Sequence, residues 1–90
     1  MISKRSVSND DVLRNAIDLN NEFLINYLLE KYQDFNADYQ ILSALQTNNF
    51  RLVDYFAAKG VDLQERYNFW KSLIPTEMRK YIANKYNIVL

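Results

Sequence analysis

Apolar residues recur along the chain with the spacing of helix faces. Leu24, Tyr27, Leu28 and Lys31 stand at i, i+3, i+4 and i+7, which places them on one face of a helix predicted from about Glu22 to Lys31. We expect Leu24, Tyr27 and Leu28 to belong to the core. The pattern predicts an all-α protein with no sheet beyond at most a vestigial turn.

Short polar motifs predict where the first helices begin and end. Ser8, with Asp11 three residues later, resembles a capping box and predicts a helix that runs to about Asp18. Asn20 and Asn21 follow. Because asparagine tolerates the left-handed backbone conformation and also accepts hydrogen bonds from the first N–H groups of a helix, this dipeptide is expected to end one helix and start the next.

The sequence matches itself at a constant offset. Residues 12–35 align with residues 40–63 without a gap, and seven of the 24 pairs are identical. Composition alone would give roughly one or two identical pairs. Asn48–Asn49 repeats the asparagine pair, and a helix is predicted from about Phe50 to Lys59, with Gly60 in a left-handed conformation just beyond it.

A third, degraded copy follows. Residues 69–74 take the place of the first helix and residues 78–82 that of the second, with a two-residue deletion near Pro75 and Thr76 as the expected cap of the last helix. Terminal repeats are commonly atypical, because one of their faces meets solvent. The sequence thus predicts one domain over residues 1–90, with repeats over about 9–36, 37–64 and 65–90.

Two segments resemble the ankyrin repeat. Leu24–Asn36 and Leu52–Leu63 are similar to that family's second helix and exit: two apolar residues, a polar one, three apolar ones, then Glu, any residue, Gly, Ala, Asp, an apolar residue and Asn. Ala16 and Ala44 stand where the family's first helix carries a small residue. The resemblance implies a short α-solenoid of about three ankyrin-like helix pairs that binds a protein partner.

The chain also departs from the ankyrin pattern. Its period, which aligns residue 12 with residue 40, is shorter than the usual repeat of about 33 residues, and the Thr-Pro-Leu-His start of that repeat does not occur. The β-turn finger is therefore expected to be truncated or absent. Tyr32 replaces the expected glycine of the first copy, so we expect that turn to be strained or differently built.

Composition argues against catalysis. The chain has no His, no Cys and a single Gly, so it lacks the commonest general base, the commonest zinc ligands, thiol nucleophiles and a glycine-rich phosphate loop. We therefore expect no enzymatic activity, no cofactor and no metal site. Abundant Asn, Lys, Ile and Tyr suit an AT-rich genome, such as a viral or bacterial one.

Charge leaves one alternative open. The chain has 11 acidic and 11 basic residues, but residues 1–38 hold seven acids against four bases, and residues 39–90 hold four acids against seven bases. Nucleic-acid binding by the basic third repeat is the alternative to protein binding, and neutral net charge makes it the weaker one. That repeat carries the bases Arg66, Lys71, Arg79, Lys80 and Lys85.

The prediction for function is a protein–protein interaction module, either a small inhibitor or an adaptor that occludes a partner's surface. With the fingers reduced, the first helices should supply the binding face. Because neither a secretory signal nor a run long enough to span a membrane is evident, an intracellular, cytoplasmic protein without membrane contact is expected. The candidate protein-binding residues are Asn15, Asp18, Leu19, Ser43, Gln46, Thr47 and Lys71.

Overall fold

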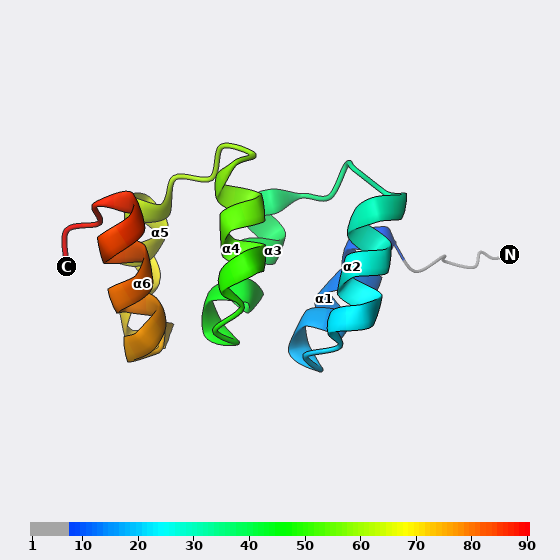
Figure 1. Cartoon of the computed structure of the whole chain (residues 1–90). Coiled ribbons are helices and arrows are strands. Elements are labelled where there is room, and N and C mark those ends of the chain that lie inside the picture. The colour runs from blue at the N-terminus through cyan, green and yellow to red at the C-terminus, as the bar shows by residue number, and fades with distance from the viewer. Residues whose placement is uncertain (1–7) are drawn as a thin grey trace, which may run out of the picture.

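Helices and the loops between them make up the computed structural model of the chain, which describes residues 8–90 (Figure 1). The part of the chain that it describes contains no strand, so the predicted all-α class is confirmed. The elements are α1 (Asn9–Asp18), α2 (Glu22–Lys31), α3 (Ala37–Gln46), α4 (Phe50–Ala57), α5 (Leu63–Trp70), the 3-10 turn η1 (Lys71–Leu73) and α6 (Thr76–Tyr86).

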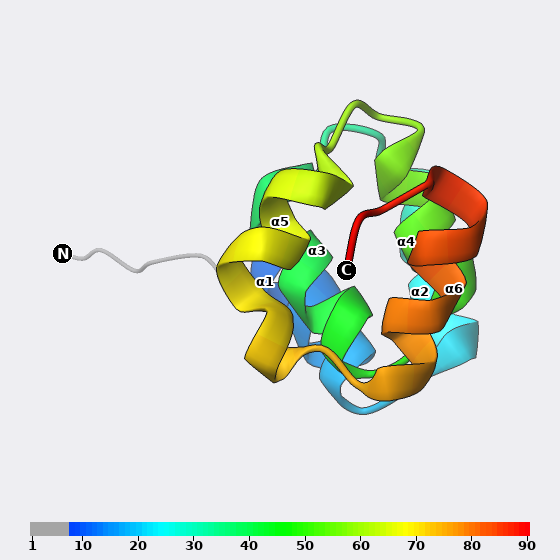
Figure 2. The same cartoon turned by 90° about the vertical axis from the view of Figure 1, so that its left-hand side faces the viewer.

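The helices form three antiparallel pairs that stand side by side in a row (Figure 1). We call α1 with α2 unit 1, α3 with α4 unit 2, and α5 with α6 unit 3. Seen along the row, α1, α3 and α5 lie in one layer and α2, α4 and α6 in the other (Figure 2). The turns within the pairs gather along one edge of the row, and the connections between pairs lie along the opposite edge.

The asparagine pairs build the turns of units 1 and 2, as predicted. Asn20 and Asn48 have φ of 55° and 56°, in the left-handed region. The N–H of Asn21 donates to the carbonyl of Ala16 at 2.9 Å, and the N–H of Asn20 donates to that of Ile17 at 3.0 Å. This pair of bonds is the Schellman motif, which satisfies the last carbonyls of α1.

The same asparagine pairs begin the second helices. The side chain of Asn21 accepts from the N–H of Leu24 at 3.1 Å, and that of Asn49 accepts from the N–H of Leu52 at 3.2 Å. Each side chain therefore caps a helix directly after its neighbour has ended the previous one.

Unit 3 follows a different register from the one predicted. Helices α1 and α3 start at Asn9 and Ala37, which keeps the offset of the self-alignment. The same offset would start α5 at Glu65 and α6 at Met78, but they start earlier, at Leu63 and Thr76. Because both helices start early by the same amount, the deletion lies before α5 and not near Pro75.

Two predictions for the ends of helices were also wrong. Helix α4 ends at Ala57 and not at Lys59, and the shift in the register of unit 3 begins at this early end. Thr76 does not cap the last helix, since α6 begins at this residue without a side-chain cap.

The connections between units contain no β-finger within the described residues. Tyr32–Asn36 joins α2 to α3 without regular structure. Tyr32 lies in ordinary extended backbone, with φ −123° and ψ 146°, so the connection is built differently from one with glycine and is not strained. Gly60 has φ of 104°, as its position after α4 predicted.

The core runs through all three units. Leu28 is buried as predicted, and Leu24 is half-buried. Leu52 and Phe56, the repeat equivalents of Leu24 and Leu28, are buried as well. The prediction for Tyr27 was wrong, because 48% of its surface is exposed. Its position on α2 faces away from unit 2, and no unit precedes unit 1 within residues 8–90 to cover it.

Candidate functional site

Most of the predicted binding residues lie along the edge that carries the turns. Asp18 and Leu19 end α1, Gln46 and Thr47 end α3, and Lys71 follows α5, so all five lie where the first helix of a pair leads toward the second (Figure 1). We call these five residues the turn edge. Asn15 lies one turn further back on α1 and is exposed.

Two predicted residues are less available than expected. Ser43 is 1% exposed, so it cannot contact a partner, and its prediction as a binding residue is corrected. The reason is the place of α3 in the row, because this helix packs against both α1 and α4 and Ser43 is one of its buried residues. Thr47 is half-buried, and its hydroxyl donates to the carbonyl of Ser43 at 2.8 Å.

Leu19 is the most exposed apolar residue of the turn edge. Its exposed fraction is 76%, and the neighbouring Asp18 and Gln46, which is the repeat equivalent of Asp18, are also exposed. A shallow hollow of about 360 Å³ lies beside it along the same edge, between the turns of units 1 and 2. This hollow is lined by Asn20, Glu22, Thr47, Asn48, Asn49, Phe50 and Arg51.

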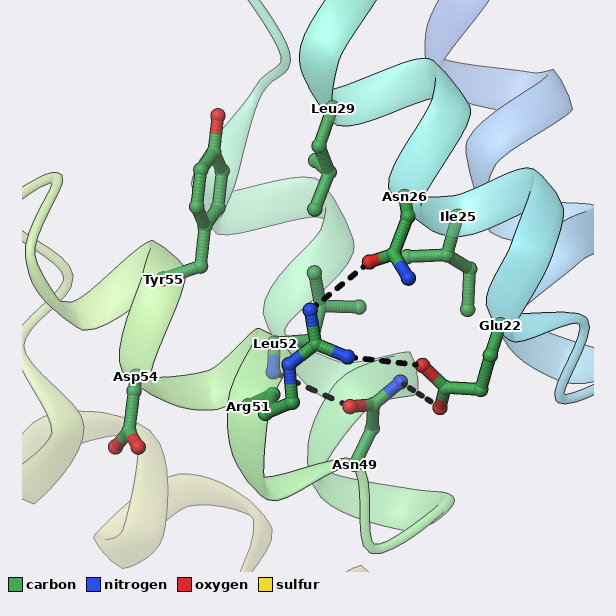
Figure 3. A pocket seen from close by; sticks show the side chains of 9 residues that line it. All are labelled: Glu22, Ile25, Asn26, Leu29, Asn49, Arg51, Leu52, Asp54 and Tyr55. Carbon is green, nitrogen blue, oxygen red and sulfur yellow. Dashed lines mark hydrogen bonds and ion pairs between the residues drawn. The ribbon is translucent and has the colours of Figure 1, made fainter.

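A second cleft, of about 300 Å³, separates α2 from α4 on the other layer (Figure 3). Ile25, Leu29 and Leu52 give it an apolar floor, and Tyr55 stands at one end. No residue pattern in the sequence indicates this cleft. Helical periodicity cannot indicate it, because a cleft depends on the spacing between two helices that belong to different units.

Polar side chains close the other end of this cleft. The guanidinium of Arg51 lies 3.6 Å from the carboxylate of Glu22 and donates to the side-chain carbonyl of Asn26 at 3.0 Å. Asn49 donates to Glu22 at 3.5 Å (Figure 3). Because Arg51 and Glu22 are both largely exposed, this ion pair contributes little to stability.

A carboxylate cluster joins α4 to α6. Asp54 accepts hydrogen bonds from the hydroxyls of Tyr81 and Tyr86, both at 2.5 Å, and from the ammonium of Lys85 at 2.9 Å. We call these four residues the Asp54 cluster. The spacing of Tyr81 and Lys85 on α6, at i and i+4, places both on the face that meets α4.

The cluster shifts the pKa values of its members. Partial burial alone would raise the pKa of Asp54, but the hydrogen bonds from Tyr81, Tyr86 and Lys85 outweigh it and hold this pKa below its ordinary value. Burial, together with the hydrogen bond to Asp54, raises the pKa of Tyr86 to about 12. At neutral pH Asp54 is thus ionised and Tyr86 keeps its proton, so the three hydrogen bonds to Asp54 join unit 3 to unit 2.

Several of the C-terminal bases are engaged within the protein. Arg66 pairs with Asp38 at 3.2 Å, Lys85 pairs with Asp54, and the side chain of Arg79 donates to the carbonyl of Ile74 at 3.0 Å. The basic third repeat therefore presents fewer unpaired charges than its sequence suggests.

The described part of the chain shows neither a metal cluster nor a membrane span. Within residues 8–90, no group of three or more His, Cys, Asp and Glu side chains is arranged to hold a metal ion. None of the helices in the same range is long and apolar enough to cross a membrane. Comparison of the chain with protein-family models, with curated proteins and with solved structures found no match.

Proposed function

We propose that this protein is a protein-binding module, an inhibitor or adaptor built as a short ankyrin-like solenoid, and that it binds its partner through the turn edge. The observation that carries the proposal is the exposure of Leu19, 76%, between polar neighbours. A large apolar side chain within a polar rim is the common arrangement of an interface anchor.

The order of the units supports the same proposal. Because the first helices lie in one layer and their ends share one edge, side chains from all three units can contact one partner (Figure 2). Asp18, Gln46 and Lys71 are exposed there, and none of them has a hydrogen-bond or ion-pair partner among the described side chains. Their bonding capacity is therefore free for a partner.

The nucleic-acid alternative has less support. Tight, non-specific nucleic-acid binding needs several unpaired bases that can neutralise phosphates. Arg66, Arg79 and Lys85 already bond to protein groups, and net charge is zero. We therefore expect no oligonucleotide binding tighter than the micromolar range at physiological salt, and a mobility-shift assay checks this.

Affinity purification with matched variants tests the proposal. The wild-type protein and the Leu19→Asp variant are used as baits in the native host, and the captured protein is then titrated against both by calorimetry. Val89→Asp is the control, because Val89 is equally exposed, at 77%, but lies at the far end of the row. We expect Leu19→Asp to weaken binding at least about tenfold and Val89→Asp to leave it unchanged. Equal binding by all three proteins would exclude the turn edge as the site.

A further inference from the structure

The Asp54 cluster has a second copy of its donors elsewhere in the chain. Tyr81, Lys85 and Tyr86 follow the order Tyr, three residues, Lys, Tyr, and residues 27–32 follow the same order with Tyr27, Lys31 and Tyr32. The two sets are equivalent in the fold. Since α2 starts at residue 22 and α6 at residue 76, the tyrosine is the sixth and the lysine the tenth residue of each helix. Unit 2 lacks a complete set, because Gly60 occupies the third position.

The two donor sets share their geometry as well as their sequence. The ammonium of Lys31 lies 3.2 Å from the hydroxyl of Tyr27, and that of Lys85 lies 3.4 Å from the hydroxyl of Tyr81. Lys31 lies 5.6 Å from the ring centre of Tyr27, and Lys85 lies 5.7 Å from that of Tyr81. Tyr27 and Lys31 are thus already arranged as Tyr81 and Lys85 are when they bind Asp54.

Tyr32 and Tyr86, the third members of the two sets, lie at similar distances from the lysine but differ in backbone conformation. Lys31 lies 5.9 Å from the ring centre of Tyr32, and Lys85 lies 6.0 Å from that of Tyr86. Tyr32, however, lies in extended backbone just after α2, whereas Tyr86 is the last residue of α6. The correspondence is therefore closest for the tyrosine–lysine pair.

Tyr27 and Lys31 lie on a face of α2 whose equivalent in units 2 and 3 contacts the preceding unit. On α4 and α6 the equivalent face meets the unit before it: Arg51 reaches Glu22, and Tyr81 reaches Asp54. On α2 this face carries Phe23 and Tyr27, which are 82% and 48% exposed. No carboxylate within residues 8–90 bonds to Tyr27 or Lys31. We call Phe23, Tyr27 and Lys31 the open face.

We propose that the open face binds an acidic helix of a partner protein, with an Asp or Glu carboxylate accepting from Tyr27 and Lys31 as Asp54 accepts from Tyr81 and Lys85. The partner helix would lie against α2 as α4 lies against α6, with Phe23 supplying apolar contact. Charge complementarity favours a carboxylate, because an ammonium and a hydroxyl that converge on one point form charge-assisted hydrogen bonds with it. The hydrogen bond to Tyr27 also raises the pKa of Lys31, which keeps it charged. The proposal rests on the proposed function in that the partner is a protein, but its site is distinct from the turn edge.

A peptide copied from this chain tests the proposal. The probe has the sequence of residues 49–59 and carries Asp54 in the helix that donors of this kind already bind. A covalent side-chain bridge keeps it helical, because so short a helix is marginal in water. It is titrated into the full-length, isotope-labelled protein and followed by NMR. We expect saturable shifts at Phe23, Tyr27 and Lys31 with a dissociation constant below about 1 mM.

Matched variants identify the contact. The Asp54→Asn peptide, and the Tyr27→Phe and Lys31→Met proteins, should each weaken binding about fivefold or more, because each removes a charge-assisted bond. Lys59→Met is the control: Lys59 is the repeat equivalent of Lys31, lies over Tyr55 in the same way at 5.1 Å from the ring centre, and belongs to a unit whose face is already covered. It should leave binding unchanged.

Three results would overturn the inference. These are equal affinity for the Asp and Asn peptides, shifts that map to the turn edge, and no binding by a protein whose NMR spectrum shows it to be folded. Sedimentation of the protein alone adds a fourth: self-association that Lys31→Met abolishes would make a second copy the occupant. If the peptide does not bind but capture of a partner protein still depends on Leu19, the open face is excluded as a binding site and the proposed function stands.

Discussion

Replacing Asp54 by Ala should strongly destabilise the fold, because it removes three hydrogen bonds between units 2 and 3 at once. A hydrogen bond to a charged group contributes about 1.5–3 kcal/mol. The three bonds from Tyr81, Tyr86 and Lys85 share one acceptor, however, and the Asp54 side chain is 29% exposed, so their contributions are not additive. We therefore expect a loss of about 2–4 kcal/mol in the free energy of unfolding, which lowers Tm by roughly 10 °C or more in a domain of this size.

The pH dependence separates charge from packing. Since the folded pKa of Asp54 lies below its ordinary value, the carboxylate stabilises the folded state above that ordinary value, and this stabilisation is lost as the pH falls through the lowered pKa. The Asp54→Asn variant keeps the shape and loses the charge. Its stability should therefore fall short of wild type around pH 7, and the difference should shrink toward acid pH.

Urea unfolding followed by far-ultraviolet circular dichroism measures both effects. Asn26→Ala is the matched control, because Asn26 is the repeat equivalent of Asp54 and makes one hydrogen bond, to Arg51, which is largely exposed. It should cost less than about 1 kcal/mol. A cost of Asp54→Ala under about half a kcal/mol, as for an ordinary surface substitution, would show that Asp54 does not hold units 2 and 3 together. A difference between wild type and Asp54→Asn that is the same at every pH would show that the charge of Asp54 is not the cause.

Three further predictions concern packing, backbone and alkaline pH. Phe56→Ala should cost about 3–5 kcal/mol by urea unfolding, because Phe56 is buried, whereas Phe23→Ala should cost under about half a kcal/mol. Gly60→Ala should destabilise by about 1–3 kcal/mol in the same assay, because φ of 104° strains any residue with a Cβ although the space beside it is open. Tyr86, with its pKa of about 12, should ionise last in an ultraviolet titration. The protonated Tyr86 stabilises the folded state below the ordinary tyrosine pKa, and this stabilisation is lost as the pH rises through the folded value. The Tyr86→Phe variant should not show this loss of stability.

Local chemistry made the first two units predictable from the sequence. Asparagine pairs both end and begin helices, and the bonds of Asn20 and Asn21 depend only on residues within a few positions along the chain. The end of α1 and the start of α2 were therefore predicted correctly. The start of unit 3 was not, because α4 ends early, at Ala57, although Lys59 still matches Lys31 of the first copy.

Burial depends on neighbours, and that explains the errors at the candidate site. The self-alignment makes Asn15 equivalent to Ser43, yet Asn15 is exposed and Ser43 is buried. Helical periodicity predicts which way a side chain points on its helix, but whether another helix covers it depends on the position of the unit in the row. Tyr27 and Tyr55 show the same effect, since only Tyr55 has a preceding unit beside it.

The two ends of the row differ, and this difference predicts at which end a partner helix binds. Asp10 accepts from Gln40, and Asp38 pairs with Arg66, so the same position of each first helix bonds to the next unit. In unit 3 that position is Gln64, whose side chain exchanges two hydrogen bonds with the backbone of Val89, at 2.8 Å and 3.2 Å. On Gln64, the backbone of Val89 thus occupies the place that a side chain of the next unit has on Asp10 and Asp38. A helix that extends the row beyond unit 1 finds Tyr27 and Lys31 without a carboxylate partner among the described residues. It should therefore bind there with one copy per protein, and sedimentation of the complex measures that ratio.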